Sequence, residues 1–429
     1  MKNIRKTAVL SVASCGLVAG AAIAQESSNY YSRDKYEAVM DRRQPAFDPE
    51  PLRLGAFLVS SQAVAGLSYN SNVLASNTNE QSDVIALLGV EADARTNWSV
   101  HEIGGTVSAY RSEYNDLGDE SANDLRASLR GRFDFTREFS LGGRVFAEQR
   151  VEPRTEPAGD SGLKSPVELT LSGVEGQANY YNDRVQWNNS VTLTKTNYDD
   201  GVQVGTGLPI DQDFRDNQRT DARSRMSYAI SPNLAVFAQG TVSQQDFDDE
   251  QFIGGVLRSR DSSGYTVSGG VNFELNSLVR GDIAVGYLNE DKDDDYFTDV
   301  DGLSVDGRMQ WFPSRLTTVS FDAGRRVVDV GSYESPTAIS TRFGARVDHE
   351  LYRNIILSGY GGVTNFEYQE IDQEDDTLDF GVSGIYKMNK RVHLEAFLRR
   401  LSRDTSGSAA ASSRDYDVNM VGVELRLHP

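Results

Sequence analysis

The segment DLRASLRGRFDF, residues 124–135, decides the fold. One set of alternate positions carries apolar or small side chains, namely Leu125, Ala127, Leu129, Gly131, Phe133 and Phe135. The other set carries polar and charged side chains, namely Asp124, Arg126, Ser128, Arg130, Arg132 and Asp134. Successive side chains of a strand point to opposite faces, so this period of two predicts a β-strand with one lipid-compatible face and one wet face.

The same alternation recurs from residue 59 onward, in segments of about ten residues, as is typical of membrane strands. Clear examples run through residues 185–194, 265–275, 303–311 and 392–398. Soluble β-sandwiches also alternate, so a single strand does not separate the two classes of protein. The connections between the strands have to decide between them.

Short turns and long polar segments follow one another in strict alternation along the chain. The short turns lie around 96–97, 136–138, 182–183, 231–233, 276–277, 312–314, 352–354 and 389–390. The long segments lie at about 70–82, 111–122, 151–166, 199–217, 246–261, 290–301, 328–338, 369–376 and 404–414. A sandwich has no reason to separate its loops by length in this way.

Nine hairpins give eighteen strands, an even number that places both barrel ends at the periplasmic rim, with the long loops outside. We therefore predict an all-β protein: a single transmembrane antiparallel up-and-down β-barrel of about 18 strands, of the outer-membrane type, over residues 56–429. Closure pairs every backbone group, which lipid requires. In the last strand the alternation shifts phase between Met420 and Val421, which predicts a β-bulge.

The N-terminus predicts a Sec-type signal peptide over residues 1–24. Lys2, Arg5 and Lys6 precede an apolar run, and Ala22-Ile23-Ala24 offers a cleavage site. The alternative, a lipoprotein acylated at Cys15, would leave a very short apolar region and an unused apolar run behind it. Residues 25–55, which contain mixed charge and no strand pattern over 25–50, predict a flexible periplasmic extension. The expected location is the bacterial outer membrane.

The composition excludes several classes of protein. The net charge of −20 argues against a nucleic-acid binder, which needs a basic face. The single cysteine, Cys15, permits neither a disulfide scaffold nor a cysteine-based metal site within one chain. The four histidines lie in no recognisable nucleophile motif, so we expect neither an enzyme nor a cofactor.

Several fragments resemble the Putative beta-barrel porin 2 family of outer-membrane proteins. The fragments are LRLGAF at 52–57, YNSNVLA at 69–75, SDVI at 82–85, NWSVH at 97–101 and RFDFTR at 132–137. Members of that family are often associated with capsule or exopolysaccharide export, so the resemblance implies a polysaccharide conduit. One departure concerns the assembly machinery, because such barrels commonly end in an aromatic residue and this chain ends Leu427-His428-Pro429.

Arginines recur at positions that the alternation assigns to the aqueous lumen. They are Arg126, Arg130, Arg132, Arg144, Arg223, Arg225, Arg308, Arg342, Arg346 and Arg399. Because guanidinium binds carboxylate and phosphate in a planar fork, these residues are candidates for a path for anionic carbohydrate. The alternative is that they pair with inward carboxylates and only fill a polar interior. Two further functions stay open: a general diffusion porin, and a non-conducting structural or adhesion barrel.

Acidic clusters occupy the long segments at 246–250, 290–295 and 370–376. Their oxygens could bind Ca²⁺ or Mg²⁺, but no EF-hand spacing is present and solvated loop tips explain them, so no metal site is predicted. The expected partners are outer-membrane lipid and lipopolysaccharide, the outer-membrane assembly machinery, and periplasmic polysaccharide-export components.

Overall fold

The computed structural model describes residues 37–159, 162–331, 335–409 and 415–429. The predicted signal peptide, residues 1–24, lies outside these ranges. Over the described ranges, no helix combines the length and the apolarity needed to cross a membrane. The two helices there are short 3-10 turns, η1 (Gly118–Glu120) and η2 (Asp213–Arg215).

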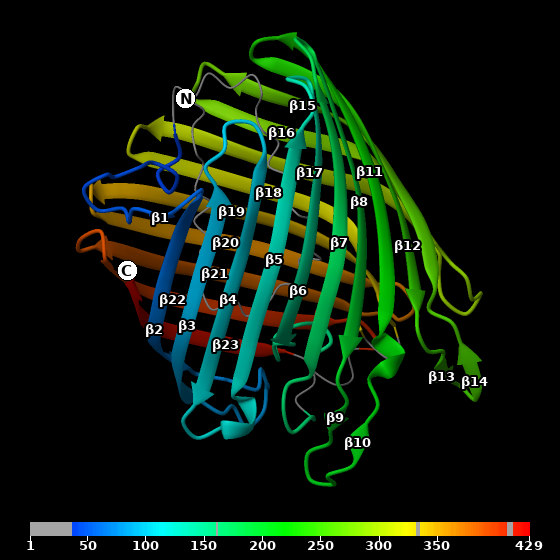
Figure 1. Ribbon diagram of the computed structural model, residues 1–429. Helices are drawn as coiled ribbons and strands as arrows, with labels where there is room; N and C mark the ends of the chain where they lie inside the picture. The colour runs from blue at the N-terminus through cyan, green and yellow to red at the C-terminus, as the bar shows by residue number, and fades with distance from the viewer. Residues whose placement is uncertain (1–36, 160–161, 332–334, 410–414) are drawn as a thin grey trace.

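Eighteen strands form one closed antiparallel barrel (Figure 1). Each pairs with the next barrel strand along the chain, and the last pairs back with the first. In chain order they are β2 (Phe57–Asn70), β3 (Asp83–Thr96), β4 (Glu102–Tyr114), β5 (Ala122–Asp134), β6 (Phe139–Val151), β7 (Glu168–Tyr181), β8 (Val185–Tyr198), β11 (Asn217–Ser231), β12 (Leu234–Phe247), β15 (Ser262–Leu275), β16 (Val279–Lys292), β17 (Val300–Ser314), β18 (Thr317–Asp329), β19 (Thr337–Tyr352), β20 (Ile355–Tyr368), β21 (Glu374–Lys387), β22 (Val392–Ser406) and β23 (Tyr416–Leu427). The predicted fold class and strand number are confirmed.

The outer face of the barrel is apolar. On β5, the outward side chains of Leu125, Leu129 and Phe133 are 44%, 65% and 56% exposed, whereas the arginines between them point inward. Large exposed apolar residues recur on the other strands in the same way. A largely apolar outer surface around a polar interior is the arrangement that lipid requires.

The connections separate by length between the two ends of the barrel (Figure 1). One end, called the turn end below, holds the short turns, and the other, called the long-loop end, holds the long connections. Two long connections contain small hairpins, formed by β9 (Gly201–Val202) with β10 (Pro209–Ile210) and by β13 (Gln251–Ile253) with β14 (Val256–Arg258). The predicted alternation of turns and loops is confirmed.

The barrel closes at a short seam between β2 and β23. These strands pair from Ala63 with Leu427 to Asn70 with Met420, which leaves the first part of β2 beyond the reach of β23. The strand β1 (Leu52–Leu54) pairs there with Phe57–Val59. Because an unpaired backbone edge is costly in lipid, β1 protects the part of the edge that it covers.

The predicted bulge in the last strand is wrong. The register between β22 and β23 runs without a shift from Arg403 paired with Tyr416 to Val392 paired with Leu427. Tyr416, Val418 and Met420 point inward and form a small buried cluster with Phe397 and Leu401 of β22. The expectation failed because it assumed a polar inner face along the whole strand, whereas this inner face is apolar near the long-loop end.

Residues 37–50 cross the turn end of the barrel (Figure 1). The Val39 amide donates a hydrogen bond to Thr318 Oγ1 on β18 at 3.0 Å. Further along, Asp48 accepts a bond from Lys387 Nζ on β21 at 2.7 Å, and the Phe47 carbonyl lies 3.0 Å from His393 Nε2 on β22. The sequence predicted a flexible extension here, but these contacts hold the described part of it against the wall.

Candidate functional site: the barrel lumen

A cavity of about 2660 Å³ occupies one side of the lumen. Inward side chains of β2 to β7 and of β22 and β23 form its wall. Arg42 and Asp48 of the N-terminal segment border it at the turn end, and Thr155 borders it at the long-loop end. Ligand pockets usually measure roughly 300 to 1,000 Å³, so this space has room for a solute of several sugar rings.

The ten predicted lumen arginines all lie at inward-facing positions of their strands, where they alternate with outward apolar or small residues. Four of them, on β5 and β6, line the cavity: Arg126, Arg130, Arg132 and Arg144. The other six are not among the lining residues and lie on β11, β17, β19 and β22: Arg223, Arg225, Arg308, Arg342, Arg346 and Arg399. The ten arginines thus share the inner face of the barrel, but only four of them lie on the wall of this cavity.

Seven of these arginines have a carboxylate partner. The pairs are Arg126 with Glu148 (3.1 Å), Arg130 with Asp93 (3.1 Å), Arg132 with Asp134 (3.1 Å), Arg225 with Asp282 (2.5 Å), Arg342 with Asp322 (3.1 Å), Arg346 with Asp348 (2.9 Å) and Arg399 with Asp379 (2.9 Å). Most join strands, and two join residues of one strand. For these seven, pairing in a polar interior describes the observed contacts.

Arg144, Arg223 and Arg308 differ from the rest. Over the described ranges, none of the three has a carboxylate oxygen within 4.0 Å of its guanidinium nitrogens. Arg223 donates instead to the Gln239 side chain at 2.5 Å. Arg144 lies opposite Arg130 in the β5–β6 register and opposite Glu175 in the β6–β7 register. Arg130 and Arg144 line the cavity and Glu175 does not, so repulsion between the two guanidiniums favours an anion at this part of the cavity wall, and the Glu175 carboxylate opposes it in part.

Aromatic rings lie flat on glycines along the inner wall, a feature that the sequence interpretation missed. A Cβ added to Gly173 would lie 2.5 Å from the Phe146 ring, and one added to Gly270 would lie 2.3 Å from the Phe237 ring. A guanidinium then covers the other side of the ring: Arg225 Cζ lies 3.5 Å from the Phe237 ring centroid. Each glycine lies directly opposite its aromatic residue on the neighbouring strand. The sequence contains both residues, but their contact can be predicted only when the register of the two strands is known.

The described parts of the β6–β7 connection, residues 152–159 and 162–167, lie over the interior at the long-loop end, and we call them the crossing loop. Glu152 binds Arg215 of η2 through two hydrogen bonds of 2.6 and 3.0 Å, with both side chains 5% exposed. Arg154 donates to Glu120 of η1 at 2.7 Å. The sequence predicted a long polar connection here and did not indicate whether it folds inward. Its prolines, at 153, 157 and 166, were the one local signal of a fixed shape.

Titratable groups in the crossing loop respond to this burial. Burial raises the pKa of Glu156 to about 8, against the weaker opposing effect of Arg150. Burial also opposes the charge of Arg215, but the Glu152 carboxylate, Tyr198 and the hydrogen bonds to Glu152 together outweigh it and raise the pKa of that guanidinium. The loop therefore holds, beside the ion pair of Glu152 with Arg215, a carboxyl that stays protonated at neutral pH.

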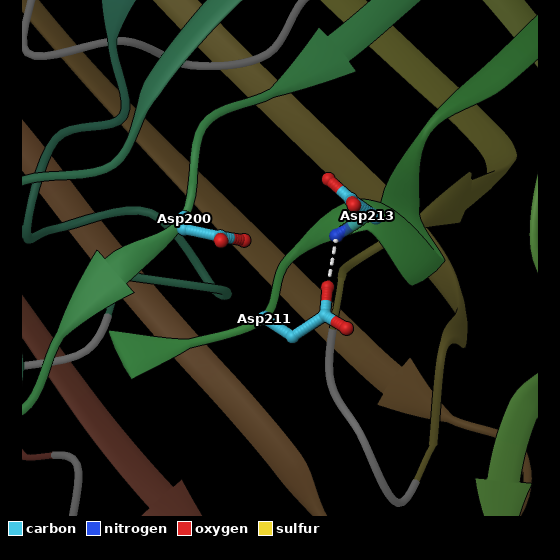
Figure 2. Close-up of side chains that lie close together, drawn as sticks. All are labelled: Asp200, Asp211 and Asp213. Atoms are coloured by element: carbon cyan, nitrogen blue, oxygen red, sulfur yellow. Dashed lines mark hydrogen bonds between the residues drawn. The ribbon is translucent and has the colours of Figure 1, made fainter. Parts of the chain in front are cut away.

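Three exposed carboxylates meet beside the β9–β10 hairpin, as Figure 2 shows: Asp200, Asp211 and Asp213. Asp211 accepts a hydrogen bond from the Asp213 amide at 2.8 Å, and Asp200 accepts one from the Gln212 amide at 3.1 Å. Desolvation, and then the charges of Asp211 and Asp200, raise the pKa of Asp213. The group belongs to hydrogen-bonded turns, and nothing else in the described ranges points to a cation there.

Each of the acidic clusters predicted in the loops has at least one member with a partner elsewhere in the barrel or its connections. Asp248 pairs with Lys195 at 3.0 Å, Glu290 with Lys292 at 2.7 Å, and Asp294 with Arg258 at 3.0 Å. Asp375 is fully buried and accepts a hydrogen bond from Tyr368 at 3.0 Å. That bond and its burial place it inside the barrel end, so the last cluster is not only a solvated tip.

The four histidines occupy three separate places on the barrel wall. His101 stacks on Phe133 with ring centroids 4.0 Å apart, and His349 lies 3.0 Å from Thr317 Oγ1. His393 contacts His428 with ring centroids 4.6 Å apart. Each of these contacts is a packing or hydrogen-bonding role within the barrel wall.

A family model described as Putative beta-barrel porin 2 matches residues 44–428. No curated protein matches the chain. Among solved structures, the copper transporter OprC has a TM-score of 0.49 at 11% identity, with 89% of this chain and 82% of that chain covered. Pseudomonas aeruginosa OccK2 (OpdF) has a TM-score of 0.46 at 11% identity, covering 86% and 98%. The siderophore receptor PirA from Acinetobacter baumannii has a TM-score of 0.47 at 6% identity, covering 86% and 80%.

Proposed function

The chain belongs to the Putative beta-barrel porin 2 family, and from that premise we propose that it is a channel for acidic carbohydrate. It is a porin-like outer-membrane β-barrel. The finer proposal concerns what passes through the lumen. Its main support is the cavity wall on β5 and β6, where Arg144 lies opposite Arg130 and, among the described residues, has no carboxylate oxygen within 4.0 Å. Glu175, its partner in the β6–β7 register, is not among the residues that line the cavity.

The charge pattern of that wall suits a carboxylated sugar. Arg126, Arg130 and Arg132 already bind carboxylates at 3.1 Å, so each can exchange a resident carboxylate for one on a passing solute. The hydroxyls of Thr106 and Ser128 lie 2.7 Å apart on the neighbouring wall and offer partners for sugar hydroxyls. Because both signs of charge line the cavity, the preference for anions rests on a few guanidiniums.

The crossing loop favours a solute of limited size. The Thr155 carbonyl accepts hydrogen bonds from Arg403 on β22 and Tyr416 on β23, both at 2.9 Å. These strands are separated from β6 by β2 to β5, so the loop spans that part of the lumen. Acidic monosaccharides and short oligosaccharides are therefore the preferred solutes. Export of a long polysaccharide, which the family resemblance implies, would require this loop to move aside.

The proposal is tested with the purified chain in planar lipid bilayers. Conductance is recorded while an oligogalacturonate or a neutral malto-oligosaccharide of the same length is added. We expect the acidic oligosaccharide to block the current at lower concentration, and Arg144→Gln to weaken that block about tenfold, as the loss of one charged hydrogen bond predicts.

Lys195→Gln is the matched control, because Lys195 lies on the outward side of β8 near the long-loop end and is 48% exposed. It should leave the block unchanged. The absence of a conducting pore would overturn free passage of solute through the unmodified chain. Equal block by acidic and neutral oligosaccharides would leave a channel but reject the preference for acidic carbohydrate.

A further inference from the structure

The crossing loop has contacts on several sides of the barrel interior. Arg154 and Glu152 fix it to η1 and η2, which lie in the adjacent connections. Thr155 reaches β22 and β23, which are separated from β6 by β2 to β5. A Cβ added to Gly331, in the β18–β19 connection, would lie 2.9 Å from the Ala158 side chain, so the loop also approaches that wall.

The ion pairs in this region are shielded from water, so solvent cannot take the place of a missing partner. The side chains of Arg154 and Glu120 are 4% and 5% exposed, and those of Arg215 and Glu152 are both 5% exposed. Removing one partner of a buried pair is strongly destabilising, because the other charge is left uncompensated. A loop that only covered the surface would not need buried pairs at positions 152 and 154, two residues apart.

The loop also borders the cavity directly. Pro153, Arg154 and Thr155 belong to the cavity lining, together with inward residues of β5 and β6 below them. A solute that enters the cavity from the long-loop end therefore passes these residues. The β13–β14 hairpin is different, because it projects away from the barrel in Figure 1.

We infer that residues 152–156 form the size-limiting constriction of the channel. In this inference, Arg154–Glu120 and Glu152–Arg215 are positioning pairs that hold the Thr155 backbone across the lumen. In this inference, residues 152–156 select solutes by their cross-section, whereas the guanidiniums of β5 and β6 select them by their charge. The inference rests on the proposed function only in requiring that the lumen conducts.

The test replaces residues 153–166 with a short glycine-serine linker. The matched control removes the β13–β14 hairpin, residues 251–258, in the same way. Single-channel conductance is measured, and liposome swelling with neutral polyethylene glycols of graded size gives the size limit. We expect the first variant to conduct at least twice as well as the unmodified chain and to admit larger polymers, and the second to behave like the unmodified chain.

A second variant covers the case in which the loop replacement does not fold. Arg154→Gln combined with Glu120→Gln removes both charges of one buried pair and leaves no charge unpaired. It should give an intermediate size limit and frequent transitions to a larger conductance. Heat-modifiable mobility on gels verifies that each variant retains the barrel.

The outcomes distinguish this inference from the proposed function. A folded loop-replacement variant with the conductance and size limit of the unmodified chain would overturn the constriction and leave the channel intact. If the unmodified chain is silent and the variant conducts, the loop is a complete plug, which supports the constriction and overturns free passage of solute. If neither conducts, both ideas fail.

Discussion

We predict that Glu156 makes the position of the crossing loop dependent on pH. Its side chain is 2% exposed, and Arg150 Nη1 donates to its Oε1 at 3.5 Å. Over the described ranges its Oε2 accepts no hydrogen bond. The charged groups that act on it are Arg150 on β6, Glu152 in the loop and Arg215 on η2, and burial raises its pKa to about 8. The substitution Glu156→Gln keeps the shape of the protonated carboxyl and removes its titration.

The size of the effect follows from the two pKa values. A Glu exposed by loop opening titrates near 4.5, whereas the buried carboxyl titrates near 8. Between these values the inward loop holds a proton that the open loop has released, so rising pH favours opening. The ratio of open to inward loop should increase by up to about tenfold per pH unit, or ~1.4 kcal/mol. Below the lower value and above the upper one, pH should have no effect through this group.

Single-channel recording between pH 5 and pH 9 measures this ratio as the time spent in the larger conductance state. The unmodified chain should show a rise of up to about a hundredfold between pH 6 and pH 8, and then a plateau. Glu156→Gln should abolish the rise. Glu250→Gln, at an exposed loop position, is the control and should retain it. A Glu156→Gln variant with the same pH dependence as the unmodified chain would refute the assignment to this carboxyl.

Two further predictions concern the barrel wall. Gly173→Ala places a Cβ 2.5 Å from the Phe146 ring and should destabilise the barrel by about 1 to 3 kcal/mol in urea unfolding from lipid vesicles; Gly176→Ala, with open space at its Cβ, should be neutral. Leu129→Lys puts a charge on an outward side chain that is 65% exposed and should cost about 2 to 4 kcal/mol in the same assay. Ser128→Lys, on the inner face, should cost much less, and equal losses at the two positions would contradict the assigned faces.

The sequence determines the wall of this barrel well because a wall strand needs only a local pattern. In DLRASLRGRFDF each outward side chain meets lipid, so alternation alone identifies the two faces. Short turns lie at one end of the barrel and long loops at the other, so the two kinds of connection alternate along the chain. Counting these connections therefore predicted the number of strands. Neither inference needs to know which residues from distant parts of the chain meet.

The interior could not be predicted because its contacts join distant residues. Arg403 and the Thr155 carbonyl are 248 positions apart, and Arg225 and Asp282 are 57 apart. A period of two places an arginine inside without naming its partner, so pairing and solute binding both stayed open. The bulge prediction failed for a related reason, since an apolar inner face is allowed where other parts of the interior cover it.

The pairing of charges in the lumen separates two properties of the channel. Where a carboxylate neutralises each guanidinium, the lumen has little net field, so we expect charge selectivity to depend on the few guanidiniums without a carboxylate partner in the described ranges, such as Arg144. We expect size selectivity to depend on the crossing loop, whose buried pairs lie at the long-loop end. Because sites without shared partners contribute independently, changes at Arg144 and at the Arg154–Glu120 pair should combine additively. A strongly non-additive double change would contradict the proposed separation of charge recognition on the wall from the size limit in the loop.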